Sequence, residues 1–386
     1  MLMIRTVRVR LYPNSMMKKH LNDLCDYRRY CWNLGLEIWN DMYDESKIMH
    51  DKRLRPSAYK VRNELVNNKA DWQYKLSARC LQLAIADLGK AWQNFLDKAQ
   101  PDWGKPQFKP KKAPRQGFKT DRAKIINNRL RLDKPHRIKE WTDIPMKGIS
   151  HTKGTLKTVS IYRENGKYWA SLPFEIKSLP AKDKTNHKDA VDINVGHFNH
   201  LGKTINVYPK KLQMLYERIK HYQWMLARKR EVNGKNACKS NNYAVVRAKL
   251  QRDYRKVSNI QHDIIQKFTT QLVNGNQTIV IEDLDVKEMQ MNHVASKGLQ
   301  RSLFAYFRQV LTYKCDWYKR KLVLADRHYP STQRCSKCGH VKKGTDKITL
   351  AGNRKHHTNH NEYVCYVCGA RMNRDENAVQ NLLQLA

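Results

Sequence analysis

Two pairs of cysteines near the C-terminal end of the sequence have the spacing of a metal site. Cys335 and Cys338 form the first Cys-x-x-Cys pair, Cys365 and Cys368 form the second, and a glycine directly follows each pair. The glycine permits the tight turn that aims backbone amides at sulfur. Four thiolates placed in this way typically hold a structural Zn²⁺ ion in tetrahedral geometry. The sequence therefore predicts a Cys₄ zinc site.

Two histidines between the cysteine pairs leave a second ligand set open. His356 and His360 lie four residues apart within the His-rich stretch 351–361, and the pairs are further apart than in the commonest zinc ribbons. A Cys₂His₂ site is therefore an alternative to Cys₄. If the cysteines alone bind zinc, the His-rich stretch is expected to be an exposed insertion.

Three acidic residues suit a second kind of metal site. Asp192 lies within one short apolar run, Glu282 ends another, and Asp375 opens a helical stretch near the C-terminus. Burying an unpaired carboxylate is costly, so such a group is normally paired, hydrogen-bonded or bound to a cation. Two Mg²⁺ ions held by carboxylates can activate water and stabilise the leaving oxygen of a phosphodiester.

Each carboxylate also has an ordinary explanation. Glu282 is followed by Asp283 and can mark a loop, and an acidic residue such as Asp375 at a helix start interacts favourably with the helix dipole. Histidines outside the zinc region, including His197 and His200, are more often structural than catalytic. Taken singly, these residue types do not establish a magnesium site.

The elements around these acids alternate between short apolar runs and long helical patterns. Runs at 190–196, 278–282 and 322–326 are typical of buried strands. Helices are expected at 209–230, 241–273 and 301–320. Such alternation predicts an α/β sheet with helices on its faces. The acids would then lie at or near the ends of its strands.

The first part of the chain has a different organisation. Residues 1–13 nearly alternate apolar and basic side chains, as a strand does, and helical patterns follow up to about residue 98. A basic segment broken by prolines begins near residue 101, and 121–180 favours strands, with an Asn165-Gly166 hairpin turn. One economical topology is a small β-domain into which a helical lobe, residues 14–100, is inserted.

The charge of the chain indicates its partner. The 386 residues include 74 Lys and Arg against 35 Asp and Glu, which gives a formal net charge of +39 spread along the sequence. Self-repulsion on this scale favours a polyanionic partner such as nucleic acid. A ribosomal or chromatin protein would show the same balance, so charge alone does not identify a reaction.

Other features of the composition bear on the compartment. No apolar run approaches the roughly 18 residues of a membrane span. The N-terminus lacks the apolar core and cleavage site of a signal peptide, which predicts a reducing compartment in which paired cysteines bind metal. The remaining cysteines are expected to be small core residues: Cys25, Cys31, Cys80, Cys238 and Cys315.

The order of these motifs resembles the TnpB (OrfB) family of transposon-encoded RNA-guided nucleases, which is related to the compact type V CRISPR effectors. The most specific part runs from Tyr-Pro-Ser-Thr-Gln at 329–333 through both cysteine pairs to Asn-Arg-Asp-Glu-Asn-Ala at 373–378. Further counterparts are the glutamate strand at 279–284, the first aspartate motif at 191–196, Gly-Lys-Pro-Gln-Phe-Lys at 104–109 and Cys-Trp-Asn at 31–33. One departure is that Gly196 follows Asp192 by four residues instead of the usual two, so the loop there is expected to differ.

The resemblance implies a mixed α/β and α+β multidomain fold. It consists of an RNase H-like RuvC nuclease domain interrupted by a zinc module, and an N-terminal β-barrel (wedge) domain with an inserted α-helical recognition lobe. The expected boundaries are 1–13 and 101–180 for the β-barrel, 14–100 for the helical lobe, 187–330 and 371–386 for the RuvC-like domain, and 331–370 for the zinc-binding, target nucleic-acid-binding module.

The resemblance also implies a metal-dependent DNA endonuclease. Asp192, Glu282 and Asp375 would be its catalytic residues and the ligands of two Mg²⁺ ions, and the four cysteines would hold structural zinc. A guide RNA derived from the transposon end would pair with one strand of double-stranded DNA beside a short flanking motif. The protein would act as a monomer with its RNA in the prokaryotic cytoplasm, at the nucleoid.

Several basic residues are candidates for contact with nucleic acid. Arg374, beside the last aspartate, could touch the scissile phosphate or simply form a surface salt bridge. The basic segment is either a solvated linker or a phosphate-gripping loop, with Lys105, Lys109, Lys111, Lys112 and Arg115 as its candidates. Two other functions remain open: a nuclease-inactive RNA-guided repressor, and a transposase with an RNase H-like fold.

Overall fold

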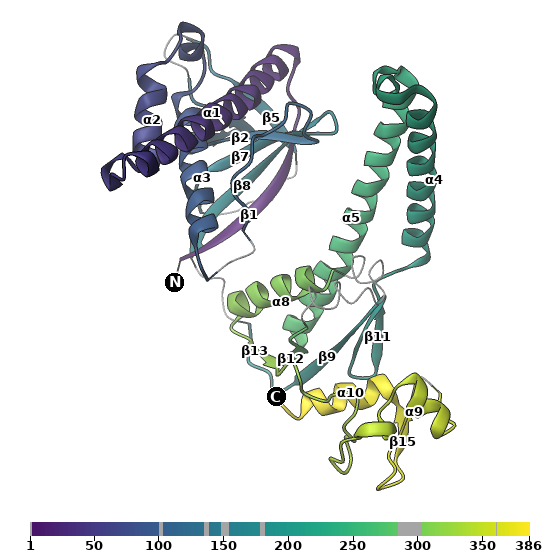
Figure 1. Cartoon of the computed structure of the whole chain (residues 1–386). Coiled ribbons are helices and arrows are strands. Elements are labelled where there is room, and N and C mark those ends of the chain that lie inside the picture. The colour runs from purple at the N-terminus through teal and green to yellow at the C-terminus, as the bar shows by residue number, and fades with distance from the viewer. Residues whose placement is uncertain are drawn as a thin grey trace. The chain divides into compact units, whose positions relative to one another are not determined.

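The computed structural model describes residues 2–99, 103–134, 139–147, 154–177, 182–284, 303–359 and 361–386. The chain divides into two units, Met1–Ser178 and Leu179–Ala386, drawn as a ribbon in Figure 1. Among the described helices, none has both the length and the apolar composition needed to cross a membrane.

The first unit is built on an antiparallel sheet that begins with the first residues of the chain. β1 (Leu2–Leu11) pairs along its whole length with β8 (Lys167–Lys177). The other strands are β2 (Arg115–Thr120), β3 (Lys124–Ile126), β4 (Arg129–Arg131), β5 (Asp143–Lys147), β6 (Thr155–Leu156) and β7 (Val159–Glu164). Their order is β2-β7-β8-β1-β5-β4-β3, with β6 paired to β8.

The β7–β8 connection is the hairpin that the sequence predicts. Asn165 and Gly166 both have positive φ, 49° and 71°. Two consecutive residues with positive φ make a turn whose twist matches that of the strands it joins, and Asn-Gly is the pair that adopts it most readily. The predicted hairpin is therefore confirmed at this turn.

The helices of the first unit lie between β1 and β2 in the sequence. They are α1 (Ser15–Ile48), α2 (Ala58–Asn67) and α3 (Ala78–Leu96), with short 3₁₀ turns at Lys52–Leu54 and Asp71–Lys75. Asn14 caps α1 by accepting a hydrogen bond from the backbone N–H of Met17 at 2.8 Å. Leu21 on α1 and Leu88 on α3 are fully buried, so the apolar faces of these helices form a core.

The second unit contains a five-stranded mixed sheet. Its strands are β9 (Lys188–Asn194), β10 (His197–His200), β11 (Lys203–Asn206), β12 (Thr278–Glu282) and β13 (Lys321–Ala325). The order is β11-β10-β9-β12-β13. β12 runs parallel to both of its neighbours, and β9, β10 and β11 form an antiparallel meander.

Helices cover both faces of this sheet (Figure 1). α5 (Asn241–Gly275) and α8 (Phe304–Tyr318) lie on one face and α10 (Arg374–Leu383) lies on the other, whereas α4 (Lys210–Asn233) packs against α5. Alternate strand residues face opposite ways. Val191 and Ile281 join the core formed with α5 and α8, whereas Ala190 and Val280 pack against Val379 on α10. Asp192 therefore points to the α10 side of the sheet.

A small module that contains both cysteine pairs precedes α10. It contains α9 (Leu350–Lys355), β14 (Glu362–Val364), β15 (Arg371–Asn373) and a 3₁₀ turn at Gly344–Asp346. β14 and β15 pair antiparallel. The module has its own small core around Cys335, Tyr363 and Cys365.

One cysteine prediction is wrong. Cys25, Cys31, Cys80 and Cys315 are buried, but Cys238 is exposed. It lies in the 3₁₀ turn Gly234–Lys239 that joins α4 to α5. Its neighbour Ala237 fills the small core at this end of the hairpin, so Cys238 faces outward.

Candidate carboxylate and zinc sites

Three of the predicted acidic residues come together on the α10 side of the second unit's sheet. Ile281 of β12 stands beside Val191 of β9 in the parallel ladder, so the next residues, Glu282 and Asp192, lie at the same level on adjacent strands. Adjacent strands are about 4.8 Å apart, which brings these two side chains close together on one face. Asp375 enters from the first turn of α10, which packs against the same face.

The electrostatics of Asp192 reflect this proximity. Asp192 is only 6% exposed. Its pKa is raised to about 7, first by burial and then by the negative charges of Glu282 and Asp375. Burial also raises the pKa of Glu282, and a hydrogen bond from Ser331 opposes that rise. A buried cluster of like charges such as this one is relieved by a bound cation.

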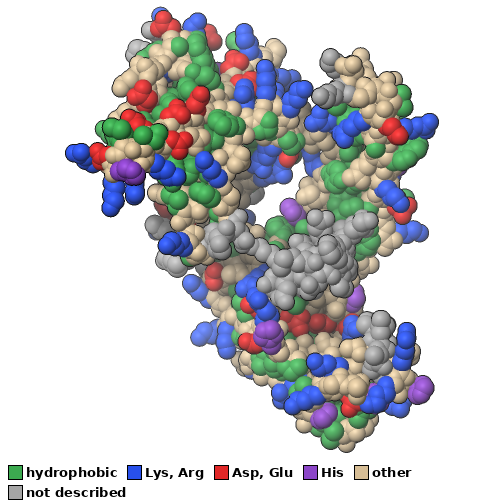
Figure 2. Space-filling view, viewed as in Figure 1, with side chains coloured by type: hydrophobic (Ala, Val, Ile, Leu, Met, Phe, Trp, Pro, Cys, Tyr) green, Lys and Arg blue, Asp and Glu red, His purple; other side chains and the backbone are tan. Residues whose placement is uncertain are grey.

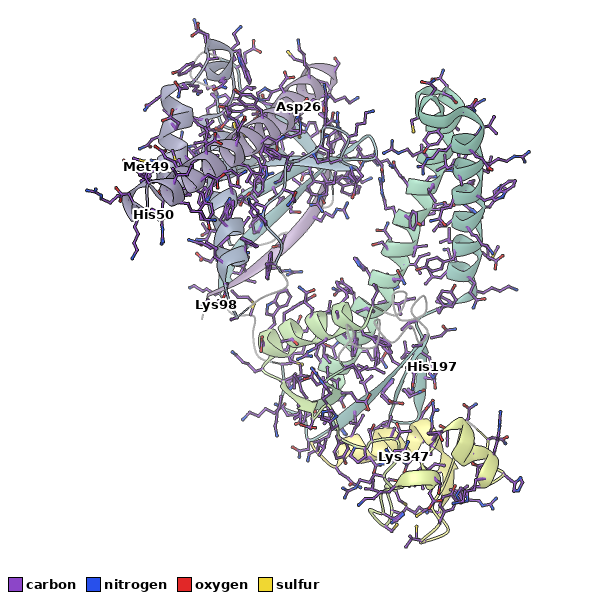
Figure 3. The ribbon with its side chains drawn as sticks, viewed as in Figure 1. Asp26, Met49, His50, Lys98, His197 and Lys347 are labelled. Atoms are coloured by element: carbon purple, nitrogen blue, oxygen red, sulfur yellow. The ribbon has the colours of Figure 1, made fainter. Side chains whose placement is uncertain are left out.

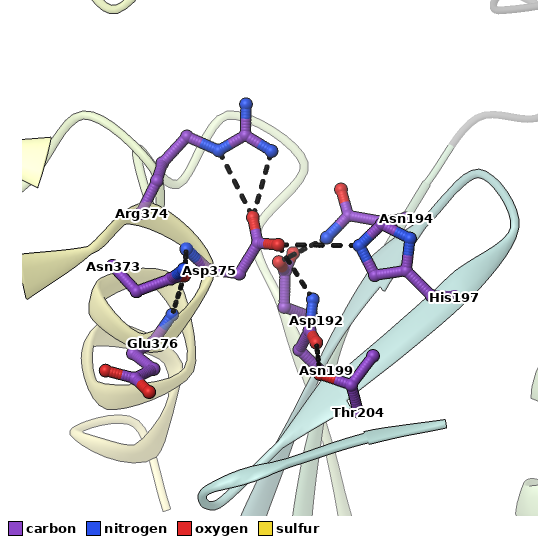
Figure 4. A network of polar contacts seen from close by, with 9 residues as sticks. All are labelled: Asp192, Asn194, His197, Asn199, Thr204, Asn373, Arg374, Asp375 and Glu376. Atoms are coloured by element: carbon purple, nitrogen blue, oxygen red, sulfur yellow. Dashed lines mark hydrogen bonds and ion pairs between the residues drawn. The ribbon is translucent and has the colours of Figure 1, made fainter. Parts of the chain in front are cut away.

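Neutral side chains orient each of the three carboxylates. Asn194 donates to Asp192 Oδ2 at 2.7 Å and Asn199 donates to Asp375 Oδ2 at 2.9 Å (Figure 4). Ser331 Oγ donates to Glu282 Oε1 at 2.6 Å. The amide of Asn199 is itself fixed, because its oxygen accepts from Thr204 Oγ1 at 2.6 Å.

Two cationic or polarisable groups also contact Asp375. Arg374 donates to Asp375 Oδ1 through Nε and Nη2, at 3.2 and 2.9 Å. His197, at the start of β10 (Figure 3), lies with Nε2 3.4 Å from Asp375 Oδ2.

The three carboxylates are hard oxygen ligands of the kind that Mg²⁺ prefers, so their chemistry fits a divalent cation. Figure 2 shows acidic side chains gathered between the sheet and α10, within a surface on which Lys and Arg are widely spread.

The four cysteines of the two pairs form a second site. Their sulfur atoms all lie within 4.8 Å of one another. Cys335 Sγ is 3.7 Å from Cys368 Sγ, and Cys338 Sγ is 3.5 Å from Cys365 Sγ. Separations near 3.7 Å are those expected of sulfurs about 2.3 Å from a common ion at the centre of a tetrahedron. The cluster could therefore hold one zinc ion.

Glycines close both cysteine turns. Gly339 and Gly369 have φ of 77° and 68°, a region that favours glycine. Their N–H groups donate to the carbonyls of Cys335 and Cys365 at 2.9 and 3.0 Å. The two turns are therefore built alike, and each aims its pair of thiols at the same point.

The histidine alternative is not supported by the position of His356. Its Nε2 is 2.9 Å from Asp346 Oδ1, and its ring stacks on Tyr366 with 4.0 Å between the centroids. It does not belong to the group of side chains within reach of one metal ion. His360 lies outside the described residues.

Three family models match separate parts of the sequence. The descriptions are "Cas12f1-like, TNB domain" for residues 304–382, "Probable transposase" of the OrfB type for 171–293, and "Helix-turn-helix domain" for 1–47. A "Putative RNA-guided DNA endonuclease" from Streptomyces pristinaespiralis is 28% identical, over 98% of this chain and 88% of its own length. The "Putative RNA-guided DNA endonuclease InsQ" of Escherichia coli K12 is 23% identical, over 98% and 92%.

The chain is similar to proteins of the TnpB (OrfB) family over nearly its whole length.

A solved structure has a similar fold over the whole length. The protein in the "Cryo-EM structure of the Cas12f1-sgRNA-target DNA complex" matches with a TM-score of 0.53 and 12% identity, covering 99% of this chain and 98% of that one. The mixed α/β fold of this chain is therefore similar to that of Cas12f1.

Three of the basic residues predicted to contact nucleic acid pack against aromatic rings of the protein itself. Lys109 Nζ lies 3.4 Å from the centre of the Trp32 ring, and burial lowers its pKa to about 7. Arg115 lies over the Tyr162 ring at 3.7 Å, and Lys105 over Trp92 at 5.5 Å. Lys111 and Lys112 are exposed.

The backbone of the segment 103–114 is held against α1. Asn33 exchanges two hydrogen bonds with the backbone of Lys109, at 2.8 and 3.1 Å, and Trp32 Nε1 donates to Gln107 O at 3.0 Å. The Trp-Asn element and the Gly-Lys-Pro-Gln-Phe-Lys segment, which the sequence singles out separately, are therefore parts of one contact. That contact makes a plain solvated linker a poor description of residues 105–109.

The sequence did not single out the hydrogen-bond donors of the carboxylate site. Asn194, Asn199 and Ser331 are neutral residues in strands and loops, and their types carry no signal of metal chemistry. Asn199 becomes significant only when the β9–β10 pairing, which opposes it to Asp192, is known. His197, expected to be structural, lies at the same site.

Proposed function

We propose that this protein is an RNA-guided DNA endonuclease that hydrolyses phosphodiester bonds at a two-metal site formed by Asp192, Glu282 and Asp375. The observation that carries the proposal is the convergence of these three carboxylates from β9, β12 and α10 in a chain of net charge +39. Relatives described as putative RNA-guided DNA endonucleases align with nearly the whole chain, which supports it.

The proposed domains follow the same boundaries as the sequence analysis. Residues 187–330 and 371–386 form an RNase H-like RuvC domain, supported by the β11-β10-β9-β12-β13 strand order and the position of the acids. Residues 331–370 form a structural zinc module that touches target nucleic acid. Residues 1–13 and 101–180 form a β-barrel (wedge) domain and 14–100 a recognition lobe, supported by the three helices that separate β1 from β2.

Each residue of the proposed site has a role that its contacts define. Asp192, Glu282 and Asp375 would hold two Mg²⁺ ions, and when bound these ions activate water and stabilise the leaving oxygen. Asn194, Ser331 and Asn199 each hold one carboxylate oxygen, and Arg374 holds the second oxygen of Asp375, so a metal ion there would compete with Arg374. Arg374 neutralises part of the charge on Asp375 while the site is without metal.

A groove beside Asp375 would seat the strand to be cut. It has a volume of about 890 Å³ and lies between the β10–β11 hairpin and α10. Three exposed cations line it, namely Lys203, Lys337 and Arg371. None of the three forms an ion pair with another residue that the structure describes, so their charges are available to phosphates.

Changing all three of these cations to alanine is expected to weaken DNA engagement without touching the carboxylates. We expect the DNA concentration for half-maximal cutting to rise about tenfold. This concentration should also depend less steeply on the salt concentration, because the variant releases fewer counterions when it binds DNA. Cleavage kinetics at several salt concentrations measure both. The matched control is to change Lys18, Lys19 and Lys47 on α1, which removes the same charge elsewhere. An equal loss in both triple variants would contradict a groove-specific role.

The raised pKa of Asp192 predicts a pH-dependent stability. In the folded chain without metal, the carboxyl group of Asp192 has a pKa of about 7, whereas its ordinary value is 3.8. The stability that the protonated form contributes is therefore complete below pH 3.8 and is lost as the pH rises through about 7. Without Mg²⁺, the Asp192→Asn variant should become more thermostable than the wild type, by a few degrees, as the pH is raised from about 5 to about 8.

Added Mg²⁺ should reduce this difference, because the ion stabilises the ionised wild-type site and has one ligand fewer in the variant. Thermal unfolding followed at several pH values, with and without Mg²⁺, measures the effect. A difference between the two proteins that stays constant across this pH range would show that Asp192 does not titrate there.

The proposed function is tested by sequencing the RNA that copurifies with the protein and by measuring DNA cleavage by the purified complex. The purified complex should contain one dominant RNA from the end of its transposon, and this complex should cut a matched duplex within a library of randomised flanking sequences when Mg²⁺ is present. Matched binding without cutting would favour a nuclease-inactive repressor, and joined DNA products would favour a transposase. A random RNA population and no cutting would favour a general RNA-binding protein.

A further inference from the structure

Two asparagines on α10 are completely buried. Asn377 and Asn381 both have 0% exposure, although asparagine is usually found at the surface. They lie four residues apart and therefore on one face of the helix. Buried amides usually form hydrogen bonds, so the partners of these two show what this face of α10 contacts, although the Oδ1 atom of Asn381 has no partner among the described residues.

Their partners are backbone groups around the first zinc cysteine. Asn377 accepts from Ser336 N–H at 2.9 Å and donates to Arg334 O at 2.7 Å. Asn381 donates to Arg334 O at 2.6 Å and to Ser331 O at 2.7 Å. The segment 331–336, which contains Cys335, is therefore hydrogen-bonded to α10 through both asparagine side chains.

The same segment and the same helix reach the carboxylate site. Ser331 donates through its hydroxyl to Glu282 while its carbonyl accepts from Asn381. Asp375 lies in the first turn of α10, two residues before Asn377. The turn at Cys335, the donor Ser331 and the helix that carries Asp375 are therefore parts of one hydrogen-bonded unit. Figure 1 shows α10 beside the sheet.

We propose that Asn377 and Asn381 are positioning residues that couple the zinc site to the carboxylate site. Bound zinc would fix the position of the turn at Cys335. The hydrogen bonds of the two asparagines hold this turn against α10 and Ser331. The position of α10 determines where the Asp375 carboxylate lies, and Ser331 orients the Glu282 carboxylate. The inference rests on the proposed function in one respect, namely that the carboxylates bind divalent metal. By linkage, zinc occupancy and metal affinity at the carboxylates must rise and fall together.

A purely structural role for the asparagines would have a different outcome. Loss of a buried amide leaves Arg334 O or Ser331 O without a donor and destabilises the fold in either case. Only coupling changes the affinity of a site that the asparagines do not touch. Outer groups that orient metal ligands typically change affinity by about 10–100-fold when they are removed.

The test uses the full chain with its copurified RNA and without DNA. Mn²⁺ binding is followed by electron paramagnetic resonance, and zinc release by a chromogenic chelator. In the Asn377→Ala and Asn381→Ala variants we expect Mn²⁺ affinity to fall about tenfold and zinc release to quicken. The matched control is Gln380→Ala, because Gln380 is exposed on the same helix and its side chain makes no hydrogen bond with a described residue. The control should behave as the wild type does.

A further variant keeps the test valid if the alanine variants fold poorly. Gln384 donates to Ser336 O at 3.2 Å from the exposed end of α10, so Gln384→Ala should give a smaller effect of the same sign. In a Cys338→Ser background, which has already lost zinc, Asn381→Ala should add little to the loss of Mn²⁺ affinity.

Three results would overturn the inference. They are lowered thermal stability with unchanged Mn²⁺ affinity, additive effects of Asn381→Ala and Cys338→Ser, and a wild-type protein that binds no Mn²⁺ at the carboxylates. Since DNA is absent from this experiment, a wild type that binds Mn²⁺ with the expected coupling but fails to cut DNA would refute the proposed function and leave the coupling standing.

Discussion

Replacing Asp192 by alanine is expected to abolish Mg²⁺-dependent cleavage of a guide-matched duplex while RNA and DNA binding stay nearly intact. The variant loses the carboxylate that interacts with the charges of both Glu282 and Asp375, and with it one of the three proposed metal ligands. We expect a loss of at least about 1,000-fold, which corresponds to roughly 4 kcal/mol of the barrier. Binding should persist, because it depends on the chain's many cations and on base pairing and not on one buried acid.

The measurement compares single-turnover cleavage with filter binding of the same labelled duplex. Asp192→Asn serves as the near-isosteric variant and should be equally inactive, since an amide cannot replace an anionic ligand. The matched control is Glu231→Ala, because Glu231 is an exposed acid on α4 that does not line the groove beside Asp375. Undiminished cutting by either Asp192 variant would contradict the assignment of Asp192, Glu282 and Asp375 as the catalytic metal site.

The sequence predicted those parts of the fold that local patterns determine. The helices at 209–230, 241–273 and 301–320 correspond to α4, α5 and α8, with ends that differ by a few residues. The apolar runs around Asp192 and Glu282 are strands of one sheet. Periodicity and turn chemistry are properties of neighbouring residues, which is why they can be identified without the structure.

Local sequence patterns did not predict the contacts between segments that are far apart in the sequence. Trp32 and Asn33 bind a segment more than seventy positions away, and Ser331 reaches Glu282 from the start of the zinc module. Cys238 looks like a core residue by its type, but it lies at a helix connection where Ala237 takes the buried place. In each case the three-dimensional fold determines which residues lie next to each other, and the spacing of residues along the sequence does not predict this.

Contacts from distant segments also distinguish Asp375 from an ordinary helix-start residue. By sequence, its position at a helix start was explained equally well by the helix dipole. In the structure, Asn199 from β10 and Arg374 both bind its carboxylate, and its charge raises the pKa of Asp192. A residue that only capped a helix would not need donors from a separate strand.

Replacing Cys335 and Cys365 by serine is expected to release zinc and unfold the module without unfolding the five-stranded sheet. The sulfurs supply half of the proposed ligand set, and Cys335, Tyr363 and Cys365 also form most of the module's small core. The core between the sheet and the helices α5 and α8 contains no residue of the module, so it should survive. Zinc binding contributes about 10–16 kcal/mol to folding in isolated zinc-finger peptides, which makes loss of the module's structure the expected result.

Metal analysis should give one zinc per intact chain and none in the double variant, and limited proteolysis should cut the variant within 337–370 first. Cys238→Ser is the matched control, because it removes an exposed thiol outside the cluster and should retain zinc. An intact protein without zinc would contradict the assignment. Loss of zinc with a module that still resists proteolysis would mean that Tyr363 and its neighbours stabilise the module without metal. Because α10 is bonded to the turn at Cys335, the released module should also take Asp375 out of position, so cleavage should be lost together with zinc.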